Sequence, residues 1–569
     1  MNQEESRNVT EPAGAESAGA EPVGTEPADT EPASPAAETT GSIERRDILK
    51  ALAGIPILGV FFWRALRKKG IDDFKKQQIL AELGDIEPAP AVIPQMRHAA
   101  GERIRLGIIG FGGEGQWLTE CAGFVTPDRI EEKRKWDREH RDGTSYRDFI
   151  NQTDLNIRIT AICDVFDVRA ENALAAAKND ERPGGGSGLE DAKRYHHYQD
   201  LLAAGDVDAV IIATPDHWHS RMAIDAVRAG KPVYLEKCMT RTEQEALDLH
   251  RAVKETGMAF QLGHQNRQVE ANDKAREIIQ RGILGPINLV ETTTNRNSPG
   301  GAWVYDIHEE GSPATIDWDL FQEAAPHKVP FSLDRFFRWR CWFDYGTGLS
   351  GDLFSHEYDT INQILEIGIP ETVTASGGIY FYDDEKFFDY FDREEFPVNE
   401  KRDVPDIFHI TCEYPDRNMT LLYSATLSNG RPRGIVLMGH DASMEVGNRL
   451  TVTADGESTR FREKIENRII DTSLPLFTYS PGQEKIDAIT SASDQYFLTR
   501  GLMYTYRGGQ RFPTNHLHIA EWLDVIRNGG KTSCNIDRGL EEAITCHMAT
   551  TSYLEGRRVR WDPRRRRIV

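Results

Sequence analysis

The sequence has no excess of basic residues. Its 569 residues include 68 Lys and Arg against 90 Asp and Glu, which gives a formal net charge of −22. Because proteins that bind nucleic acid need a basic surface, this balance argues against a nucleic-acid partner. The four arginines at 564–567 are a local exception, which we interpret as a solvated chain end.

Paired cysteines are also lacking. The seven cysteines are scattered singly, without a C-x-x-C pair. This pattern supports neither a disulfide framework nor a zinc site, so we expect no metal. His217 and His219 have the H-x-H spacing of some metal ligands but no convincing further ligands, and a position at the start of a helix is the favoured interpretation.

Bulky apolar residues are scarce in residues 1–44, where variants of "TEPADTEPASPAAETT" recur. A segment of this composition cannot bury enough surface to fold, and we expect a disordered acidic tail. An apolar run follows at residues 51–63, and it is short for a membrane-spanning helix but typical of a signal peptide.

Residues 45–100 are predicted to form a signal or anchor and a linker. Arg45-Arg46 followed by Ile48-Leu49-Lys50 resembles a twin-arginine export signal, and no A-x-A cleavage site follows. We therefore expect export to the periplasm or cell envelope, with membrane anchoring through residues 45–69 as one outcome. An amphipathic helix packed on the protein, and a cytoplasmic location, is the alternative.

A glycine-rich turn follows the apolar stretch at 104–109, which predicts a β-strand. The turn reads Gly110-x-Gly112-x-x-Gly115 and leads into a helical pattern. In this setting Gly110 permits a tight turn, Gly112 lets the main chain approach a pyrophosphate, and Gly115 allows close packing of helix on strand. The motif predicts a dinucleotide site.

The second predicted strand, "IRITAICDV", ends at Asp164. A carboxylate there can bind both ribose hydroxyls and would repel a 2′-phosphate, so NAD is favoured over NADP. The spacing from the glycines exceeds the usual 20 or so residues, and the polar segment at 126–154 accounts for the excess as an insertion. Arg169 is available to meet a phosphate, so NADP stays open.

From residue 209 to residue 262 apolar runs alternate with helical segments, which indicates a parallel sheet with crossover helices. Ligand-binding groups of such a sheet lie at the carboxyl ends of its strands. The residues at these ends are Thr214, Pro215, Glu236, Lys237, His264 and Gln265.

A polar stripe marks the predicted helix in "GTGLSGDLFSHEYDTINQIL", residues 346–365. At about 100° per residue, the side chains of Asp352, His356, Asp359 and Gln363 fall within an arc of roughly 60°. By itself this stripe is compatible with a solvated face that carries a local ion pair.

Together these motifs resemble the Gfo/Idh/MocA family of glucose–fructose oxidoreductase and inositol dehydrogenase. The resemblance covers roughly residues 101–562 and rests on the order of the glycine turn, "ATPDHWH", "AGKPVYLEK", "DWDLF", "GTGLSGDLFSH" and "EGRRVRWDP". It implies an α/β protein, with a Rossmann NAD(P)-binding domain at 101–266. A C-terminal α/β domain at 267–569, with an open, mostly antiparallel sheet, would bind substrate and form a homo-oligomer.

The resemblance also implies that Lys237, Asp352 and His356 surround the reacting carbon. His356 would act as the base, because neutral imidazole is available near neutral pH, and Asp352 would orient its ring. Lys237 would stabilise the developing alkoxide or share in a proton relay. The family's E-K-P motif reads Glu236-Lys237-Cys238 here, so its proline is replaced.

The segments "RFFRWRCWFDYG" and "NRNSPGGAW" are rich in aromatic residues and arginines, which suit sugar faces and hydroxyl or carboxylate groups. A half-buried structural element is the alternative interpretation. The resemblance adds His219 to the cofactor site. The residues expected to contact substrate are His264, Arg267, Trp339, Arg340 and Asp359.

These observations favour a nicotinamide-dependent oxidoreductase that transfers a hydride between a sugar or polyol hydroxyl carbon and NAD(P). Two alternatives stay open. One is a redox-neutral, glycoside-cleaving enzyme that uses bound NAD for transient oxidation and elimination. The other is a non-catalytic subunit that binds the cofactor or a sugar.

Overall fold

The computed structural model describes residues 74, 103–140, 143–186, 191–383, 400–431, 434–447, 450–479, 504–507 and 510–569. The predicted acidic tail at 1–44 and the predicted signal or anchor at 45–69 lie outside these ranges. Within them, no helix has both the length and the apolar character needed to cross a bilayer.

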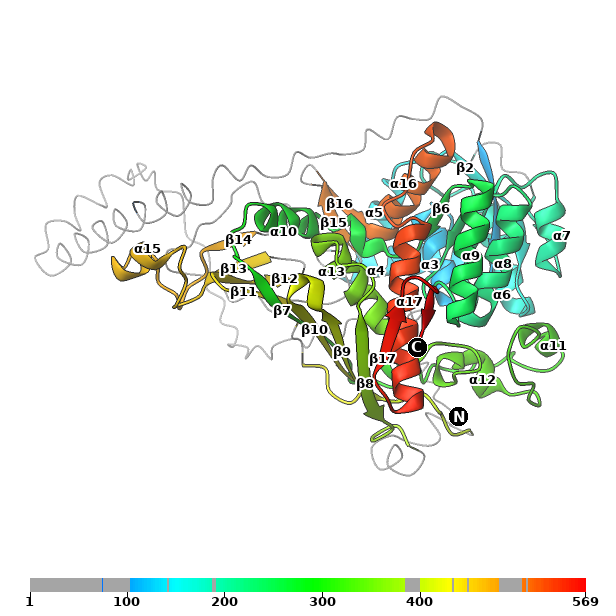
Figure 1. Cartoon of the computed structure of the whole chain (residues 1–569). Helices are drawn as coiled ribbons and strands as arrows, with labels where there is room; N and C mark the ends of the chain where they lie inside the picture. The colour runs from blue at the N-terminus through cyan, green and yellow to red at the C-terminus, as the bar shows by residue number, and fades with distance from the viewer. Residues whose placement is uncertain are drawn as a thin grey trace, which may run out of the picture.

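Two sheets organise the described structure (Figure 1). The first has six parallel strands in the order β3-β2-β1-β4-β5-β6, as the alternation of apolar runs and helices predicts. Ile108 and Ile109 of the central strand project into two different apolar clusters, so both faces of this sheet are covered. The strands are β1 (Ile104–Ile109), β2 (Ile157–Cys163), β3 (Lys193–Arg194), β4 (Ala209–Ile212), β5 (Val233–Leu235) and β6 (Phe260–Leu262).

Five helices connect these strands, and their ends follow simple capping chemistry. The longest begins with a capping box, in which Thr242 and Glu245 bind each other's backbone N–H groups, and it ends at Gly257 in the left-handed conformation. The helices are α3 (Gly113–Cys121), α6 (Asp167–Lys178), α7 (Tyr198–Ala203), α8 (Asp216–Arg228) and α9 (Glu243–Thr256).

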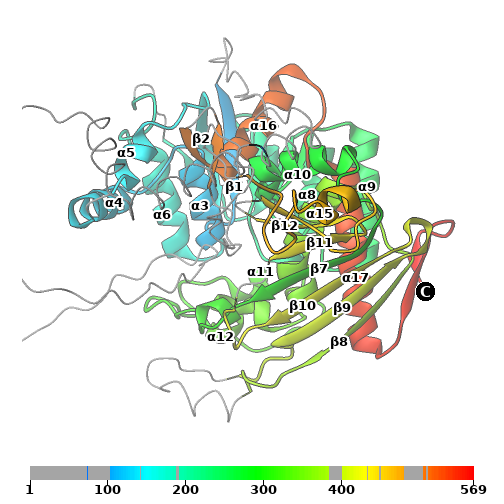
Figure 2. The same cartoon turned by 90° about the vertical axis from the view of Figure 1, so that its left-hand side faces the viewer.

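An insertion separates α3 from β2. It forms α4 (Pro127–Glu139) and α5 (Ser145–Ile150), which Figure 2 shows at one side of the parallel sheet. This excursion accounts for the long spacing between the glycine turn and Asp164.

The second sheet has ten strands in the order β14-β13-β12-β11-β7-β10-β9-β8-β17-β18. Only the central pair, β7 with β10, is parallel, and the other pairs are antiparallel. The predicted fold class is therefore confirmed. The strands are β7 (Ile287–Asn295), β8 (Thr372–Gly378), β9 (Ile407–Tyr414), β10 (Met419–Thr426), β11 (Ile435–Gly439), β12 (Ala442–Val446), β13 (Leu450–Ala454), β14 (Phe477–Tyr479), β17 (Val559–Asp562) and β18 (Arg567–Ile568).

Helices α13 (Ser355–Leu365) and α17 (Ile536–Glu555) lie between the two sheets (Figure 1), and α17 contacts both α9 and β8. Helix α10 (Glu270–Gln280) packs against α13 and β12. The shorter elements around them are η1 (Gln265–Gln268), η2 (Gly300–Ala302), α11 (Trp318–Phe321), α12 (Leu333–Phe337), η3 (Trp339–Cys341), η4 (Ser350–Phe354), η5 (Pro415–Arg417), α15 (Arg462–Glu466), β15 (Tyr504–Arg507) and β16 (Gln510–Pro513).

Helix α16 (Thr514–Asn528) comes late in the chain but packs on the parallel sheet. Ile519, Trp522 and Leu523 share an apolar cluster with β1, and the Trp117 indole N–H donates to the side-chain oxygen of Asn515 at 3.2 Å. A segment beyond residue 267 thus completes the core of the first sheet, while the predicted domain limits stay a prediction.

Candidate active site

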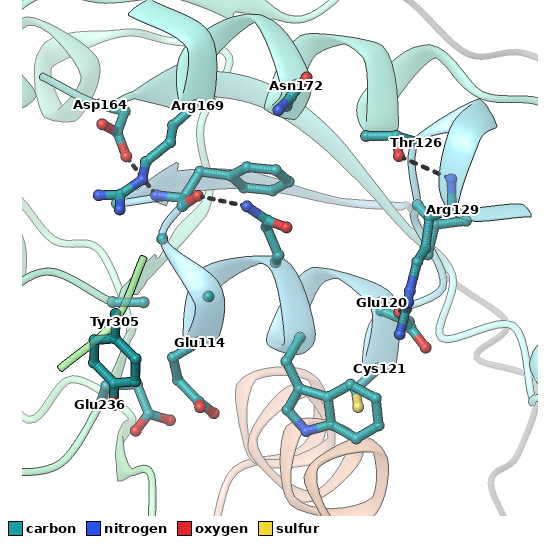
Figure 3. A pocket seen from close by; sticks show the side chains of 18 of the residues that line it. Glu114, Glu120, Cys121, Thr126, Arg129, Asp164, Arg169, Asn172, Glu236 and Tyr305 are labelled. Carbon is teal, nitrogen blue, oxygen red and sulfur yellow. Dashed lines mark hydrogen bonds and ion pairs between the residues drawn. The ribbon is translucent and has the colours of Figure 1, made fainter. Parts of the chain in front are cut away.

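A cleft of about 3040 Å³ runs along the carboxyl ends of the parallel strands. Its walls come from the glycine turn and the ends of β2, β4 and β5 on one side, and from η3, η4 and α13 on the other. Figure 3 shows the part of the cleft around α3. The cleft therefore gathers groups from both sheets, as expected for a ligand site at the strand ends.

The glycine turn has the backbone that a phosphate site needs. Gly110 has a φ of +88°, and a Cβ there would lie 2.6 Å from the Ala213 carbonyl oxygen. A Cβ at Gly115 would lie 2.3 Å from the Gly110 carbonyl oxygen, so glycine is required for α3 to start this close to β1. Gly112 directly precedes α3 and lines the cleft, which turns the helix N-terminus toward it. This geometry fits a pyrophosphate group.

Asp164 lines the cleft at the end of β2 and also supports the glycine turn. One carboxylate oxygen accepts from the Phe111 N–H at 2.6 Å and the other from the Phe166 N–H at 2.8 Å. Arg169 stands beside it, with its guanidinium 5.7 Å from the centre of the Phe166 ring. Burial lowers the pKa of Arg169 against the attraction of Asp164. A ribose bound here would meet a carboxylate and a guanidinium together.

Most of the strand-end residues expected at the cofactor also line the cleft: Thr214, Pro215, Glu236, Lys237 and Gln265.

His219 does not line the cleft. Its ring is buried behind the wall, with nitrogens 2.5 Å and 2.7 Å from the carbonyl oxygens of Cys238 and Thr214. His217 and His219 both lie in the first turn of α8, at the start of a helix as the sequence suggested. His219 therefore ties two strand ends together rather than facing a ligand.

Asp352 is the centre of the charged part of the cleft. Its Oδ1 accepts from Lys237 Nζ at 2.7 Å and from Arg340 Nε at 2.8 Å, and its Oδ2 accepts from the Trp303 indole N–H at 2.9 Å. Burial opposes its charge, but Lys237 and Arg340 hold the pKa of Asp352 well below its usual value. The peptide bond from Lys237 to Cys238 is cis, although Cys238 is not a proline.

The hydrogen bonds around His356 differ from those expected, in which Asp352 orients the His356 ring. Both oxygens of Asp352 are bound by other groups, and the His356 Nδ1 is buried without a hydrogen-bond partner among the described residues. Burial, Lys237 and His264 together lower the pKa of His356 well below its usual value. The His356 ring lines the cleft, and its lowered pKa favours the neutral imidazole.

The five residues expected to contact substrate fall into two groups. Trp339 and Arg340 line the cleft, with the Arg340 guanidinium 4.2 Å from the centre of the Trp339 ring. Arg267 and Asp359 instead bind each other behind the wall through bonds of 2.6 to 3.0 Å, and both are buried. His264 is also buried there, edge-on to the His356 ring at 5.4 Å. These three support the wall and do not line the cleft.

Two further groups at the cleft were not assigned to the site from the sequence: Glu114 and Tyr305. Arg296 also lines the cleft, and it belongs to the segment "NRNSPGGAW" that the sequence analysis proposed for substrate contact. Glu114 lies inside the glycine motif and could be located from the sequence. An acid in the first turn of a helix is common, however, because the helix dipole favours negative charge there without any ligand. Arg296 and Tyr305 follow β7, and only the fold brings that segment to the parallel sheet.

Residues 142–264 match the family described as an oxidoreductase family with an NAD-binding Rossmann fold, GFO_IDH_MocA. The chain is 25% identical over 248 residues to 2,7-anhydro-N-acetylneuraminate hydratase of Escherichia coli, covering 43% of this chain and 53% of that protein. It is 23% identical over 346 residues to scyllo-inositol 2-dehydrogenase (NADP(+)) of Bacillus subtilis, covering 59% and 79%. The match thus spans about half the length of the first of these relatives.

Among solved structures, the fold is similar to that of levoglucosan dehydrogenase in complex with NADH and levoglucosan. The TM-score is 0.51 at 17% sequence identity, and the similarity covers 81% of this chain and 99% of the other. The likeness concerns the arrangement of the two sheets. The similarity to the family model is found in residues 142–264, which run from the segment before β2 to the end of β6.

Proposed function

We propose that this protein is an NAD-dependent oxidoreductase that moves a hydride between a hydroxyl-bearing carbon of a sugar or polyol and the nicotinamide ring. The observation that carries the proposal is the meeting of Lys237, Asp352 and His356 in the same cleft as the glycine turn. Bound NAD would supply the ring that accepts the hydride. The residues that would hold it are Gly110, Gly112, Asp164, Thr214, Pro215, Glu236 and Gln265.

Lys237 would hold and polarise the reacting hydroxyl. Burial opposes its charge, but the attraction of Asp352 outweighs burial and raises the pKa of Lys237, so the ammonium group stays charged. A fixed cation inside a largely buried cleft stabilises the negative charge that develops on the substrate oxygen. Asp352 would act on this step by fixing the ammonium and the Arg340 guanidinium in place.

His356 would accept the hydroxyl proton. Its lowered pKa keeps the imidazole neutral at pH 7, and its Nδ1 has no partner among the described residues. A neutral ring with a free nitrogen can take a proton as the carbonyl forms.

A carbohydrate or polyol substrate is supported by the Trp339–Arg340 pair, which offers an aromatic face and a hydrogen-bond donor side by side. The names of the relatives point the same way, since one acts on an anhydro sugar acid and the other on an inositol.

The similarity to a hydratase favours a second candidate, a redox-neutral enzyme. Such an enzyme would oxidise a sugar transiently, allow elimination or addition next to the new carbonyl, and return the hydride. The two candidates differ in one observable: only the dehydrogenase forms NADH in net amounts.

The experiment measures dinucleotide binding to the purified protein and then net NADH formation with a panel of sugars and polyols. We expect Lys237→Met and His356→Ala each to lower turnover by roughly 10²- to 10⁴-fold, the usual contribution of a positioned acid or base. Lys193→Met and His327→Ala are matched controls, because these side chains are 67% and 78% exposed. Full activity of both cleft variants would refute the assignment.

Export and oligomer formation belong to the same proposal. The twin-arginine pair at 45–46 would direct the folded, cofactor-loaded protein to the cell envelope. Cell fractionation with and without Arg45→Ala and Arg46→Ala tests the location, and sedimentation of the purified protein tests the oligomer.

A further inference from the structure

Two carboxyl groups share the part of the cleft next to Lys237. Neither has a role in the hydride or proton transfer proposed above, although Glu236 is one of the residues that would hold NAD. Glu114 lies in the first turn of α3, and Glu236 directly follows β5. Both line the cleft, and Figure 3 shows their side chains next to each other near Tyr305.

Glu236 is a buried carboxylate with an unused oxygen. The residue is 4% exposed, and its Oε2 accepts from the Lys237 backbone N–H at 3.1 Å. Its Oε1 has no hydrogen-bond partner among the described residues. Gly263 makes room for this oxygen, because a Cβ there would lie 2.3 Å from it. The Glu236 side chain therefore fits at the cleft because residue 263 is a glycine, and its Oε1 has no hydrogen-bond donor among the described residues.

Both acids resist ionisation. Burial raises the pKa of Glu236 well above its usual value, and the charge of Glu114 adds to this. Burial also raises the pKa of Glu114, against the attraction of Lys237 and Arg340. Two neighbouring carboxyl groups in a desolvated site favour the state in which they share one proton. The other titratable or charged groups that face the pair are Lys237, Arg340, Asp352, Tyr234 and Cys121.

The pair lies in the nicotinamide half of the sheet. In a doubly wound dinucleotide fold the two halves of the cofactor bind on opposite sides of the first strand, with the adenosine ribose at the end of the second. Glu236 follows β5, which is separated from β1 by β4 on the side away from β2. The oxidised nicotinamide ring carries a positive charge and the reduced ring is neutral, so a nearby carboxylate distinguishes the two.

We propose that Glu114 and Glu236 form a proton-sharing pair that releases its proton to solvent when oxidised cofactor binds and keeps it when reduced cofactor binds. This inference rests on the proposed function, because it requires NAD in the cleft. During turnover the substrate C–H would give its hydride to the ring and the O–H proton would pass to His356. The ring then loses its positive charge, and the carboxyl pair takes up one proton from solvent.

Calorimetric titration with NAD⁺ and with NADH, each in two buffers of different ionisation enthalpy, counts the protons released on binding. Near pH 7 we expect a release of up to one proton for NAD⁺ and close to none for NADH. Glu114→Gln should abolish this difference and lower the ratio of NAD⁺ to NADH affinity by about tenfold, which corresponds to one pKa unit.

Glu236→Gln is a second variant with the same expected result, so that a folding defect in one variant does not decide the matter. Glu323→Gln is the control, since this side chain is 49% exposed and pairs with Arg221 on the surface. Equal proton release with NAD⁺ and NADH in the unmodified protein would overturn the carboxyl-pair inference alone. Binding of neither form would overturn the proposed function as well.

Discussion

Replacing Asp352 by asparagine tests whether one buried carboxylate holds the cationic side of the cleft together. It accepts from Lys237 Nζ at 2.7 Å, from Arg340 Nε at 2.8 Å and from the Trp303 indole at 2.9 Å. The Lys237 and Asp352 side chains are only 12% and 10% exposed. Asparagine keeps the shape but removes the charge, which leaves two cations facing each other.

Removing one member of a buried ion pair costs about 3–5 kcal/mol, because the remaining charge loses its compensation. The Arg340 side chain is 22% exposed and can be partly solvated from the cleft, which favours the lower end of that range. We therefore expect Asp352→Asn to lower the free energy of unfolding by about 3 kcal/mol at pH 7.

The pH dependence follows from the lowered pKa of Asp352, which Lys237 and Arg340 cause against the effect of burial. A carboxyl group of this kind stabilises the fold fully above its unfolded pKa of about 3.9, and this contribution is lost as the pH falls toward the folded value. The difference between the two proteins should be constant from about pH 5 to pH 8 and should shrink below about pH 4.

Urea unfolding followed by tryptophan fluorescence measures both effects. Asp167→Asn is the matched control, because its pair with Arg194 is on the surface, with side chains 52% and 29% exposed, and should contribute less than about 1 kcal/mol. A loss below about 1 kcal/mol for Asp352→Asn, or a difference that persists unchanged in acid, would refute the reasoning.

Two further predictions separate the cofactor site from its supporting wall. Gly115→Ala should weaken dinucleotide binding by at least about tenfold, since its Cβ would lie 2.3 Å from the Gly110 carbonyl oxygen and the glycine turn must shift. Titration calorimetry measures the affinity, and an unchanged value would contradict the role of the turn. Asp359→Asn should lower the free energy of unfolding by about 3 kcal/mol, because the buried Arg267 loses its charged partner. Dinucleotide affinity should stay unchanged, because neither residue lines the cleft. A parallel loss of affinity would place this pair at the ligand instead.

The parallel sheet and its glycine turn could be predicted because their signals are local. A buried strand, three glycines and an acid at the next strand end can each be recognised within a few residues. They meet because ligand-binding groups of a parallel sheet lie at the carboxyl ends of its strands. The insertion before Asp164 could also be predicted, because the polar segment that forms α4 and α5 separates two apolar strands that are each still recognisable.

The polar stripe was harder to interpret, because its geometry and its partners are not local. The prediction assumed a regular α-helix through Asp352 and His356, whereas Asp352 lies in η4, a π-helical turn that precedes α13. The side chains of the predicted polar stripe also have different partners in the structure. Asp352 meets Lys237 from the other sheet, while Asp359 meets Arg267 behind the wall. Helical periodicity predicts which residues share a face but not which distant group each one binds.

Glu114 shows why a site that joins two sheets cannot be predicted from one motif. In the sequence it is an acid in the first turn of a helix, a position that the helix dipole favours without any ligand. Its chemistry changes only because the fold brings Glu236, from the end of β5, and Arg340, from beyond β7, into the same desolvated cleft. Neighbouring like charges and burial, rather than residue type, then decide that one carboxyl group keeps a proton. The property that would let this cleft distinguish oxidised from reduced nicotinamide therefore depends on the tertiary contact between three segments.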